Sequence, residues 1–240
     1  MKKTIFISGA NYIHYHSLRQ LLNSFIHQVD ELDYVIYIFN LGLKESQWGF
    51  LQSRPQYNRL NIVWMNYNIG ACPDYYNDLQ TYAFKQRCME MVIEQETSNV
   101  TLIWMDSANF IYKPLKELVE LVQDCIVYSP YSADTIARWC HPTTIRNMDA
   151  QIFSDRTMRA GGLIGIDMTQ DMGKHFFHQY SMCNKQREMI TPHGSNKANH
   201  RQDQSVLSCL YWRYVHKGAI KHVTDDWVCV DFHYNFFLGE

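Results

Sequence analysis

The sequence predicts an α/β protein with a mostly parallel central sheet flanked by helices in a single domain. Short runs of apolar residues recur at positions 34–39 and 100–105, which is typical of strands buried on both faces. Segments with apolar residues at helical spacing lie between such runs, as in βαβ units. The 240 residues and 46% hydrophobic content suit one domain with a substantial core, so we expect the domain to span residues 1–240.

The first half of the chain alternates between strands and helices. A first strand is predicted at residues 5–7, and the helix that follows has its apolar residues on one face, at Leu18, Leu21, Leu22, Phe25, Ile26 and Val29. Further strands are predicted at residues 34–39, 61–66, 100–105 and 125–128, with helices at residues 78–96 and 114–122. A Rossmann-like sheet of this kind binds ligands at the carboxyl ends of its strands. We therefore expect the site at residues 8–11 and 106–109, which follow two of these strands.

The second half is less regular, and its polar stretch contains the turn residues Pro192 and Gly194. In chain order, we expect a glycine-rich strand at residues 160–166, a helix at 170–180, a loop at 185–201, a helix around 206–214 and a last strand at 227–231.

The charge and the cysteines exclude several classes of protein. The formal net charge is −2, so no general field attracts nucleic acid or an anionic membrane. The seven cysteines include no C-x-x-C pair, which disfavours a zinc ribbon, and their odd number is typical of reduced thiols. Met1 to Lys3 resemble the start of a signal peptide, but the apolar run that follows is short, and no run approaches the ~20 apolar residues that span a bilayer. We therefore expect a cytoplasmic protein without a transmembrane segment.

Two acidic residues are the strongest candidates for chemistry. Asp106 comes directly after a buried strand, where it could bind a divalent metal or a ribose, or could instead cap the next turn. Asp203 lies in the sequence HRQDQS at residues 200–205, which places a base, a cation, an acid and an amide ahead of a helix. The structural alternative for Asp203 is the N-cap of that helix.

Three further signals are weaker. Gly161 and Gly162 would let the backbone approach a ligand closely, although packing glycines are commoner. Lys85 follows aromatic residues at a helix start, where it could neutralise phosphate or simply reach solvent. Asp231 and His233 would point to one face of an extended segment and could hold a metal together.

Taken in chain order, these motifs resemble those of GT-A-fold glycosyltransferases, whose donors are nucleotide sugars. The family pattern is Y-x-x-K-P, D-A-G and H-R-x-D-Q-S, and the chain departs from it with Gln86 where Pro is usual. The matching elements are Tyr82-Ala83-Phe84-Lys85-Gln86, Asp106-Ser107-Ala108, the run AGGLIG at residues 160–165 and HRQDQSVLS at residues 200–208, which is the most specific. Glycogenin-like transferases show a looser match, in which His233 takes the place of a metal-binding histidine. The resemblance covers residues 1–235.

The resemblance implies a role for each of these residues. The donor would be bound by Ser8, Gly9, Ala10, Asn11, Lys85, Asp106, Ser107, Ala108, Gly161, Gly162 and Arg201. Asp203 would be the general base on the acceptor side. Asp106, as the surviving acid of the D-x-D motif, would bind a divalent metal, Mn²⁺ or Mg²⁺, with His233.

One departure from the family bears on that metal. A D-x-D motif would have an acid where this chain has Ala108. Asn109 or Asp231 could substitute for it, or the metal could be bound weakly. Alternatively, Lys85, Arg159 and Arg201 could neutralise the diphosphate without metal.

The expected function is transfer of a sugar from a nucleotide-diphosphate sugar to a hydroxyl acceptor on a glycan, glycolipid or protein. With Asp203 as base, direct displacement with inversion is the simplest mechanism, but the D-Q element also occurs in retaining families. The missing acid at Ala108 favours one alternative, a non-catalytic nucleotide- or glycan-binding module on a decayed transferase fold. A methyltransferase is a further alternative, but it would want a glycine-rich loop after the first strand, where Gly9 is the single glycine.

Overall fold

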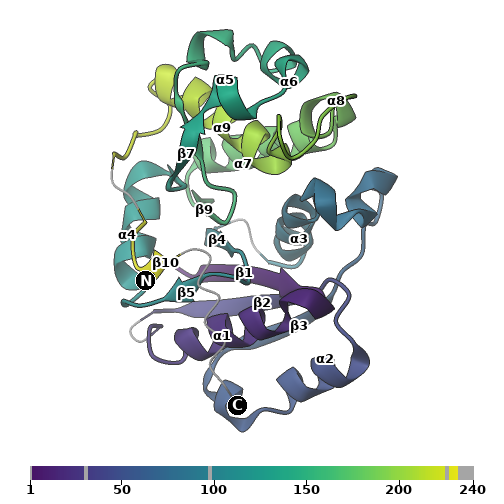
Figure 1. Ribbon diagram of the computed structural model, residues 1–240. Helices are drawn as coiled ribbons and strands as arrows, with labels where there is room; N and C mark the ends of the chain where they lie inside the picture. Colours follow the sequence, from purple (N-terminus) through teal and green to yellow (C-terminus); the bar gives the residue numbers. More distant parts are fainter. Residues whose placement is uncertain (1, 30–31, 97–98, 225–226, 232–240) are drawn as a thin grey trace.

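A computed structural model describes residues 2–29, 32–96, 99–224 and 227–231 (Figure 1). Its centre is a six-stranded sheet in the order β3-β2-β1-β4-β9-β6. In chain order these strands are β1 (Thr4–Ala10), β2 (Tyr34–Asn40), β3 (Ile62–Asn66), β4 (Thr101–Met105), β6 (Val127–Tyr128) and β9 (Leu163–Asp167). The predicted α/β class with a mostly parallel sheet is confirmed.

The direction of the strands changes at one edge of this sheet. Strands β3, β2, β1 and β4 run parallel, with Ile7 opposite Tyr37 on one side and Trp104 on the other. Strand β9 pairs antiparallel with β4 and with β6, so the glycine-rich strand enters the sheet against the direction of its neighbour. Its first residue, Leu163, therefore lies opposite Met105, the last residue of β4. This pairing brings Gly161 and Gly162 to the carboxyl end of β4.

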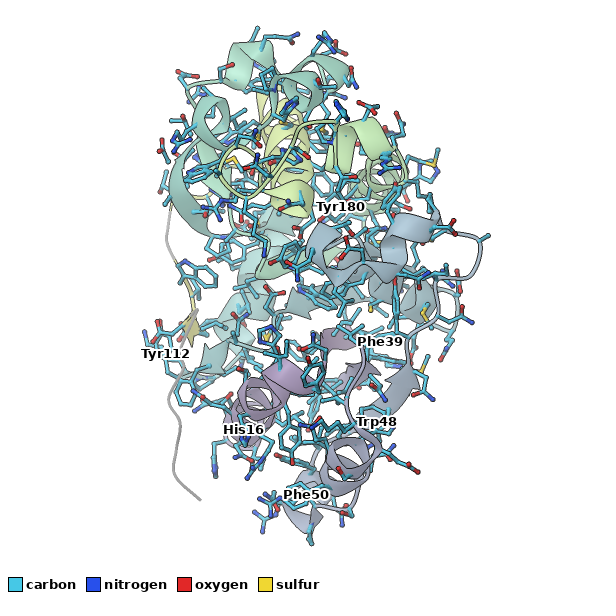
Figure 2. All side chains as sticks on the ribbon, turned by 45° about the vertical axis from the view of Figure 1, so that its right-hand side comes forward. His16, Phe39, Trp48, Phe50, Tyr112 and Tyr180 are labelled. Atoms are coloured by element: carbon cyan, nitrogen blue, oxygen red, sulfur yellow. The ribbon has the colours of Figure 1, made fainter. Side chains whose placement is uncertain are left out.

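The sheet buries both faces against helices, which explains why its strands are apolar throughout. Ile5 and Ile7 pack with α3 (Phe84–Ile93), α7 (Asp171–Asn184) and α9 (Gln202–His216). Phe6, between them in the sequence, packs on the opposite face with α1 (Tyr15–Phe25) and α4 (Lys116–Cys125). Figure 2 labels two buried side chains of the first of these layers, Phe39 at the end of β2 and Tyr180 on α7.

One predicted helix begins later than its pattern indicates. The predicted helix spans residues 78–96, but its first part forms a short 3-10 turn, η4 (Leu79–Thr81), and α3 begins only at Phe84. Between them Tyr82 has a left-handed backbone with φ 58°, which a continuous helix does not allow. The break turns the Tyr82 ring and the start of α3 toward the carboxyl end of the sheet, where Tyr82 and Lys85 line the cavities described below.

Several short elements complete the fold. The helix α8 (Arg187–Ile190) lies within the predicted loop, and the last predicted strand is reduced to β10 (Val230–Asp231), which pairs with β5 (Phe110–Ile111) outside the main sheet. The others are α2 (Glu45–Gln52), α5 (Ile136–Trp139), α6 (Pro142–Asn147), β7 (Tyr131–Thr135), β8 (Thr157–Arg159), η1 (Tyr12–His14), η2 (Pro55–Arg59), η3 (Asp74–Asn77) and η5 (Gln151–Phe153). The seven cysteines are free thiols, as predicted. Over the described ranges, every helix is too short or too polar to pass through a bilayer.

Candidate active site

Two adjacent cavities lie at the carboxyl end of the parallel strands. The first, of about 230 Å³, is lined by Gly9 and Ala10 from the end of β1, by Asn11 and by residues 106–108 after β4. The second, of about 210 Å³, is lined by Gly161 and Gly162 before β9 and by the start of α9. Tyr82, Lys85 and Asp106 line both cavities. The predicted site therefore lies at the sheet edge where parallel strands end, with Lys85 between its two halves.

Lys85 is the charged centre of this site. Its side chain is 4% exposed, and its Nζ lies 2.9 Å and 3.1 Å from the two carboxylate oxygens of Asp106. The same ammonium donates to the carbonyl oxygen of Gly161 at 2.9 Å and lies 3.4 Å from Oδ2 of Asp203. Burial alone would lower the pKa of Lys85, but Asp106 and then Asp203 outweigh it and raise that pKa above its ordinary value. Lys85 is therefore a fixed cation that joins the two candidate acids, and the solvent-exposed alternative does not hold.

The carboxylate of Asp106 is held from two sides. Besides Lys85, the indole Nε1 of Trp104 donates to its Oδ1 at 2.7 Å. The backbone N–H of Asp106 donates to the carbonyl of Gly162 at 2.8 Å, which fixes the end of β4 to the glycine-rich segment. The carboxylate oxygens of Asp106 thus accept from Lys85 and Trp104 rather than capping the next turn.

Asp203 is almost completely buried, with 3% of its surface exposed. Helix α9 has Arg201 as its N-cap, so Asp203 is not the cap of this helix. The pKa of Asp203 is raised to about 6. Burial is the main cause, Asp106 adds to it, and Lys85 acts in the opposite direction. Its Oδ2 has no hydrogen-bond partner among the described residues, although it lines the second cavity. A buried carboxylate with an unused lone pair and a raised pKa is the kind of group that accepts protons in active sites.

The rest of the HRQDQS motif explains how Asp203 is placed. His200 is fully buried; its Nε2 bonds the carbonyl of Ile190 at 2.9 Å and its Nδ1 accepts from the backbone N–H of His141 at 3.2 Å. The guanidinium of Arg201 stacks on the ring of Trp139 at 3.9 Å. Ser205 Oγ donates to the carbonyl of Trp139 and accepts from the backbone N–H of Arg201. Most of the motif therefore connects the start of α9 to residues 139–141, and these contacts hold Asp203 and Gln204 at the cavity.

The buried His200 predicts loss of stability in acid. Its ring needs an unprotonated Nδ1 to accept from His141, and burial lowers the pKa of His200 to about 4. The unfolded chain binds this proton near pH 6.5, so stability is lost as pH falls from 6.5 toward 4, by roughly 3 kcal/mol from this residue. We expect His200→Gln, which does not titrate, to flatten the decline measured by urea unfolding between pH 7 and 4.5. Equal pH slopes in both proteins would contradict this role of His200.

Gly161 is needed because Asp203 passes close to it. A Cβ at position 161 would lie 2.9 Å from Oδ2 of Asp203 and 3.4 Å from Cβ of Gln204. Under the function proposed below, Gly161→Ala should displace the carboxylate and lower the kcat/KM of transfer by about 10²-fold, with a loss of stability of about 1–3 kcal/mol. Gly49→Ala is the matched control, because no atom lies within 4 Å of the added methyl group. Transfer at the wild-type rate by the Gly161 variant would contradict this account.

The other predicted residues fall into four groups. Gly9, Ala10, Asn11, Ser107 and Ala108 line the first cavity, and Gly161, Gly162 and Arg201 line the second. Ser8 is an inner residue of β1 and lines neither cavity, because the strand continues to Ala10 rather than ending at residue 7. His233 lies outside the described residues.

Neither Arg159 nor the possible substitutes for the second acid reach the cavities. Arg159 is fully buried between the rings of Tyr131 and Tyr211, at 4.5 Å and 4.4 Å from their centroids. Asn109 donates to the carbonyl of Gly162 at 2.9 Å, and Asp231 lies in β10 beside β5. These three are absent from the linings of both cavities.

The described side chains do not fit a divalent metal at this site. A metal site needs several free oxygen or nitrogen ligands, and no group of three His, Cys, Asp or Glu residues suited to a metal occurs in the part of the chain described. The carboxylate oxygens of Asp106 are already hydrogen-bonded to Lys85 and Trp104, and Ala108 supplies no ligand. The expected metal pair of Asp106 and His233 stays a prediction, because His233 lies outside the described residues.

Sequence reasoning missed several residues that line the second cavity, chiefly Lys197, Gln202 and Gln204. Gln204 was visible only as part of the motif. Gln202 has φ 37°, an unusual backbone for a residue other than glycine, and no sequence signal announces it. Lys197 lies in a polar loop, where a lysine is expected to be solvated.

Several solved structures with this architecture are glycosyltransferases. The bifunctional glycosyltransferase WbbM in its apo form matches with a TM-score of 0.58 at 10% identity, over 88% of this chain and 37% of that chain. The galactosyltransferase LgtC, in complex with donor and acceptor sugar analogues, matches with a TM-score of 0.55 at 12% identity, over 87% of this chain and 70% of that one. Mouse xyloside xylosyltransferase 1, in its apo form, matches with a TM-score of 0.56 at 10% identity, over 93% of this chain and 85% of that chain.

The fold is that of the GT-A glycosyltransferases. No protein-family model matches the sequence, and no curated protein matches it significantly. At identities of 10–12% the likeness concerns the fold, and this chain spans only 37% of WbbM. The sequence motifs and the architecture therefore indicate the same fold, whereas activity depends on the side chains of the site.

Proposed function

We propose that this protein is a glycosyltransferase that moves a sugar from a nucleotide-diphosphate sugar to a hydroxyl group of an acceptor glycan, glycolipid or protein. One observation carries the proposal: Asp203 is a buried carboxylate that lines the second cavity, and its Oδ2 lies 3.4 Å from the ammonium of Lys85 with no hydrogen bond among the described residues. The GT-A architecture supports placing a nucleotide sugar at this edge of the sheet.

We assign the nucleotide to the first cavity and the donor sugar to the second. The first cavity has the aromatic side chains of Tyr82, Phe84 and Trp104 and the short residues Gly9 and Ala10, which suit a flat base and its ribose. The second cavity is lined by Lys85, Asp106 and Asp203, so in this proposal the donor sugar and the diphosphate that carries it lie there, next to the proton acceptor.

The acceptor has a separate approach. A third and wider hollow, of about 590 Å³, shares Gln80 with the first cavity and Gln202 with the second. Its lining is mostly polar, with Asp78, Arg187 and His193 among its residues. Such a lining suits the hydroxyl groups of a saccharide, and it opens next to the residue before Asp203.

In the proposed reaction, the acceptor hydroxyl attacks the anomeric carbon and the bond from that carbon to the diphosphate oxygen breaks. Asp203 accepts the hydroxyl proton as the new glycosidic bond forms, and the nucleoside diphosphate leaves. With one carboxylate on the acceptor side, the simplest course is direct displacement with inversion.

The first test is calorimetric titration with a panel of nucleotide-diphosphate sugars, followed by assays of donor hydrolysis and transfer to simple glycosides. We expect one donor to bind with micromolar affinity and to be hydrolysed slowly without an acceptor. Asp106→Asn should weaken donor binding, because it loosens the hold on Lys85. No binding to any donor would contradict the proposal.

A second candidate function is a binding module that lacks catalysis. Ala108 in place of an acid and the engaged carboxylate of Asp106 favour it. Donor binding without any hydrolysis or transfer would support this candidate over the enzyme.

A further inference from the structure

Two cations with exposed side chains line the second cavity, and neither has an acidic partner in the part of the chain that the structure describes. Lys197 and Arg201 both line it together with Lys85, Asp106 and Asp203. Lys85 forms ion pairs with both acids of the cavity. Within the ranges that the structure describes, neither Lys197 nor Arg201 forms an ion pair with a carboxylate. The cavity thus has three cations against two acids, and the excess positive charge lies on Lys197 and Arg201.

These two cations are held in place by polar and aromatic neighbours rather than by acids. The Nζ of Lys197 donates to Oε1 of Gln80 at 2.6 Å, across 117 positions of the chain, and lies 5.9 Å from the ring centroid of Tyr82. The guanidinium of Arg201 stacks on Trp139 at 3.9 Å. These contacts orient each side chain, while its charge faces solvent and is not balanced by an acid among the described residues. This is the arrangement expected of an anion site before its anion binds.

The acids Asp106 and Asp203 do not provide a site for a divalent metal, which is the usual alternative for neutralising phosphate. A divalent metal needs free carboxylate oxygens, whereas Lys85 occupies the space among Asp106, Asp203 and the carbonyl of Gly161. Lys85 itself is already balanced by two acids, so it adds no net charge for a ligand. A dianion that enters the second cavity therefore meets its unpaired positive charge at Lys197 and Arg201.

We propose that Lys197 and Arg201 bind the diphosphate of the donor directly, so that this site holds and releases the leaving group without a divalent metal. The inference rests on the proposed transferase function for its ligand. Arginine suits this role because its planar N–H groups match two phosphate oxygens, and lysine adds a compact charge. The two cations also stabilise the negative charge that grows on the diphosphate as the sugar leaves.

The test uses inorganic pyrophosphate, which carries the diphosphate and no base or sugar. We expect it to bind the full chain in EDTA, measured by calorimetry, and to bind at least about tenfold more weakly to Lys197→Ala and to Arg201→Ala. The exposed Lys217→Ala and Arg146→Ala, which remove the same charges outside the three cavities, are the matched controls and should bind as the wild type does. Circular dichroism and thermal unfolding would show that each variant is folded.

Several results would overturn the inference. Pyrophosphate binding that requires Mg²⁺ or Mn²⁺ would show that a metal binds the diphosphate. Equal losses of affinity in the control variants would show that the effect comes from the overall charge of the protein. A nucleotide sugar that binds and is transferred equally well by all four variants would contradict the role of these two cations and leave the transferase intact. Conversely, pyrophosphate binding sensitive to Lys197 and Arg201, with no binding of any nucleotide sugar, would keep the anion site and reject the transferase.

Discussion

Asp203→Asn should abolish most of the transfer while making the folded protein more stable. The variant keeps the size of the side chain but removes the proton acceptor, so we expect kcat to fall by about 10²–10⁴-fold with donor affinity unchanged. Stability should move the other way, because the wild-type protein buries an ionised carboxylate whose Oδ2 has no hydrogen bond within the described ranges.

The size and the sign of this stability change follow from the raised pKa. The pKa of Asp203 rises from 3.8 to about 6 in the folded protein. An acid with a raised folded pKa favours the folded state at low pH, and this contribution is lost as pH rises from about 4 to about 6. Above pH 6 the ionised form costs about 3 kcal/mol, which Asp203→Asn removes. We therefore expect the variant to be more stable than the wild type in urea unfolding at pH 8, and to lose this advantage near pH 4.

The same pKa predicts the pH dependence of the wild-type enzyme. A general base must be ionised, so kcat/KM should rise with pH up to about 6 and then level off. Asp155→Asn, which changes an exposed acid that lines neither cavity, is the control for both measurements. Unchanged transfer by Asp203→Asn, or lower stability than the wild type at pH 8, would contradict the assignment of Asp203.

The parallel half of the fold could be predicted because burial on both faces leaves a clear record in the sequence. Strands such as Tyr34–Asn40 and Thr101–Met105 are apolar at every inner position, and turn residues bound them. The antiparallel direction of Leu163–Asp167 could not be predicted in the same way, since a short apolar run looks the same in both directions. The late start of α3 was hidden for another reason, because a tyrosine does not signal the left-handed backbone that Tyr82 adopts, as a glycine would.

The site could be predicted in part for a related reason. Asp106 and Asp203 stand where strand ends and helix starts converge, which topology fixes. The burial of Lys85 did have a signal, since Lys85 shares the spacing of Cys88, Met89 and Val92 on the buried face of α3. A lysine on such a face must meet an acid. Lys197 had no comparable signal, because its position depends on how the loop before α9 folds back toward Gln80.

Lys85→Met should damage both the stability and the chemistry of the site. Methionine fills most of the space, but it leaves Asp106 and Asp203 without the ammonium that balances them. Removing one partner of a buried ion pair typically costs about 3–5 kcal/mol. Asp203 can avoid part of this cost by binding a proton, because Lys85 is the group that lowers its pKa. The destabilisation should therefore be large at pH 8 and small near pH 5, and transfer should be lost at neutral pH because the proton acceptor is protonated.

A double variant separates this explanation from a simple loss of packing. If the repulsion between the acids is the cause, Asp203→Asn should rescue much of the stability of Lys85→Met at pH 8, so the two changes will not be additive. Lys217→Met, at an exposed position at the end of α9, controls for the change of residue type. Additive effects, or a loss of stability in Lys85→Met that does not vary with pH, would show that Lys85 acts through packing. In that case the coupling of Lys85 to Asp203 would have no part in the chemistry of the site.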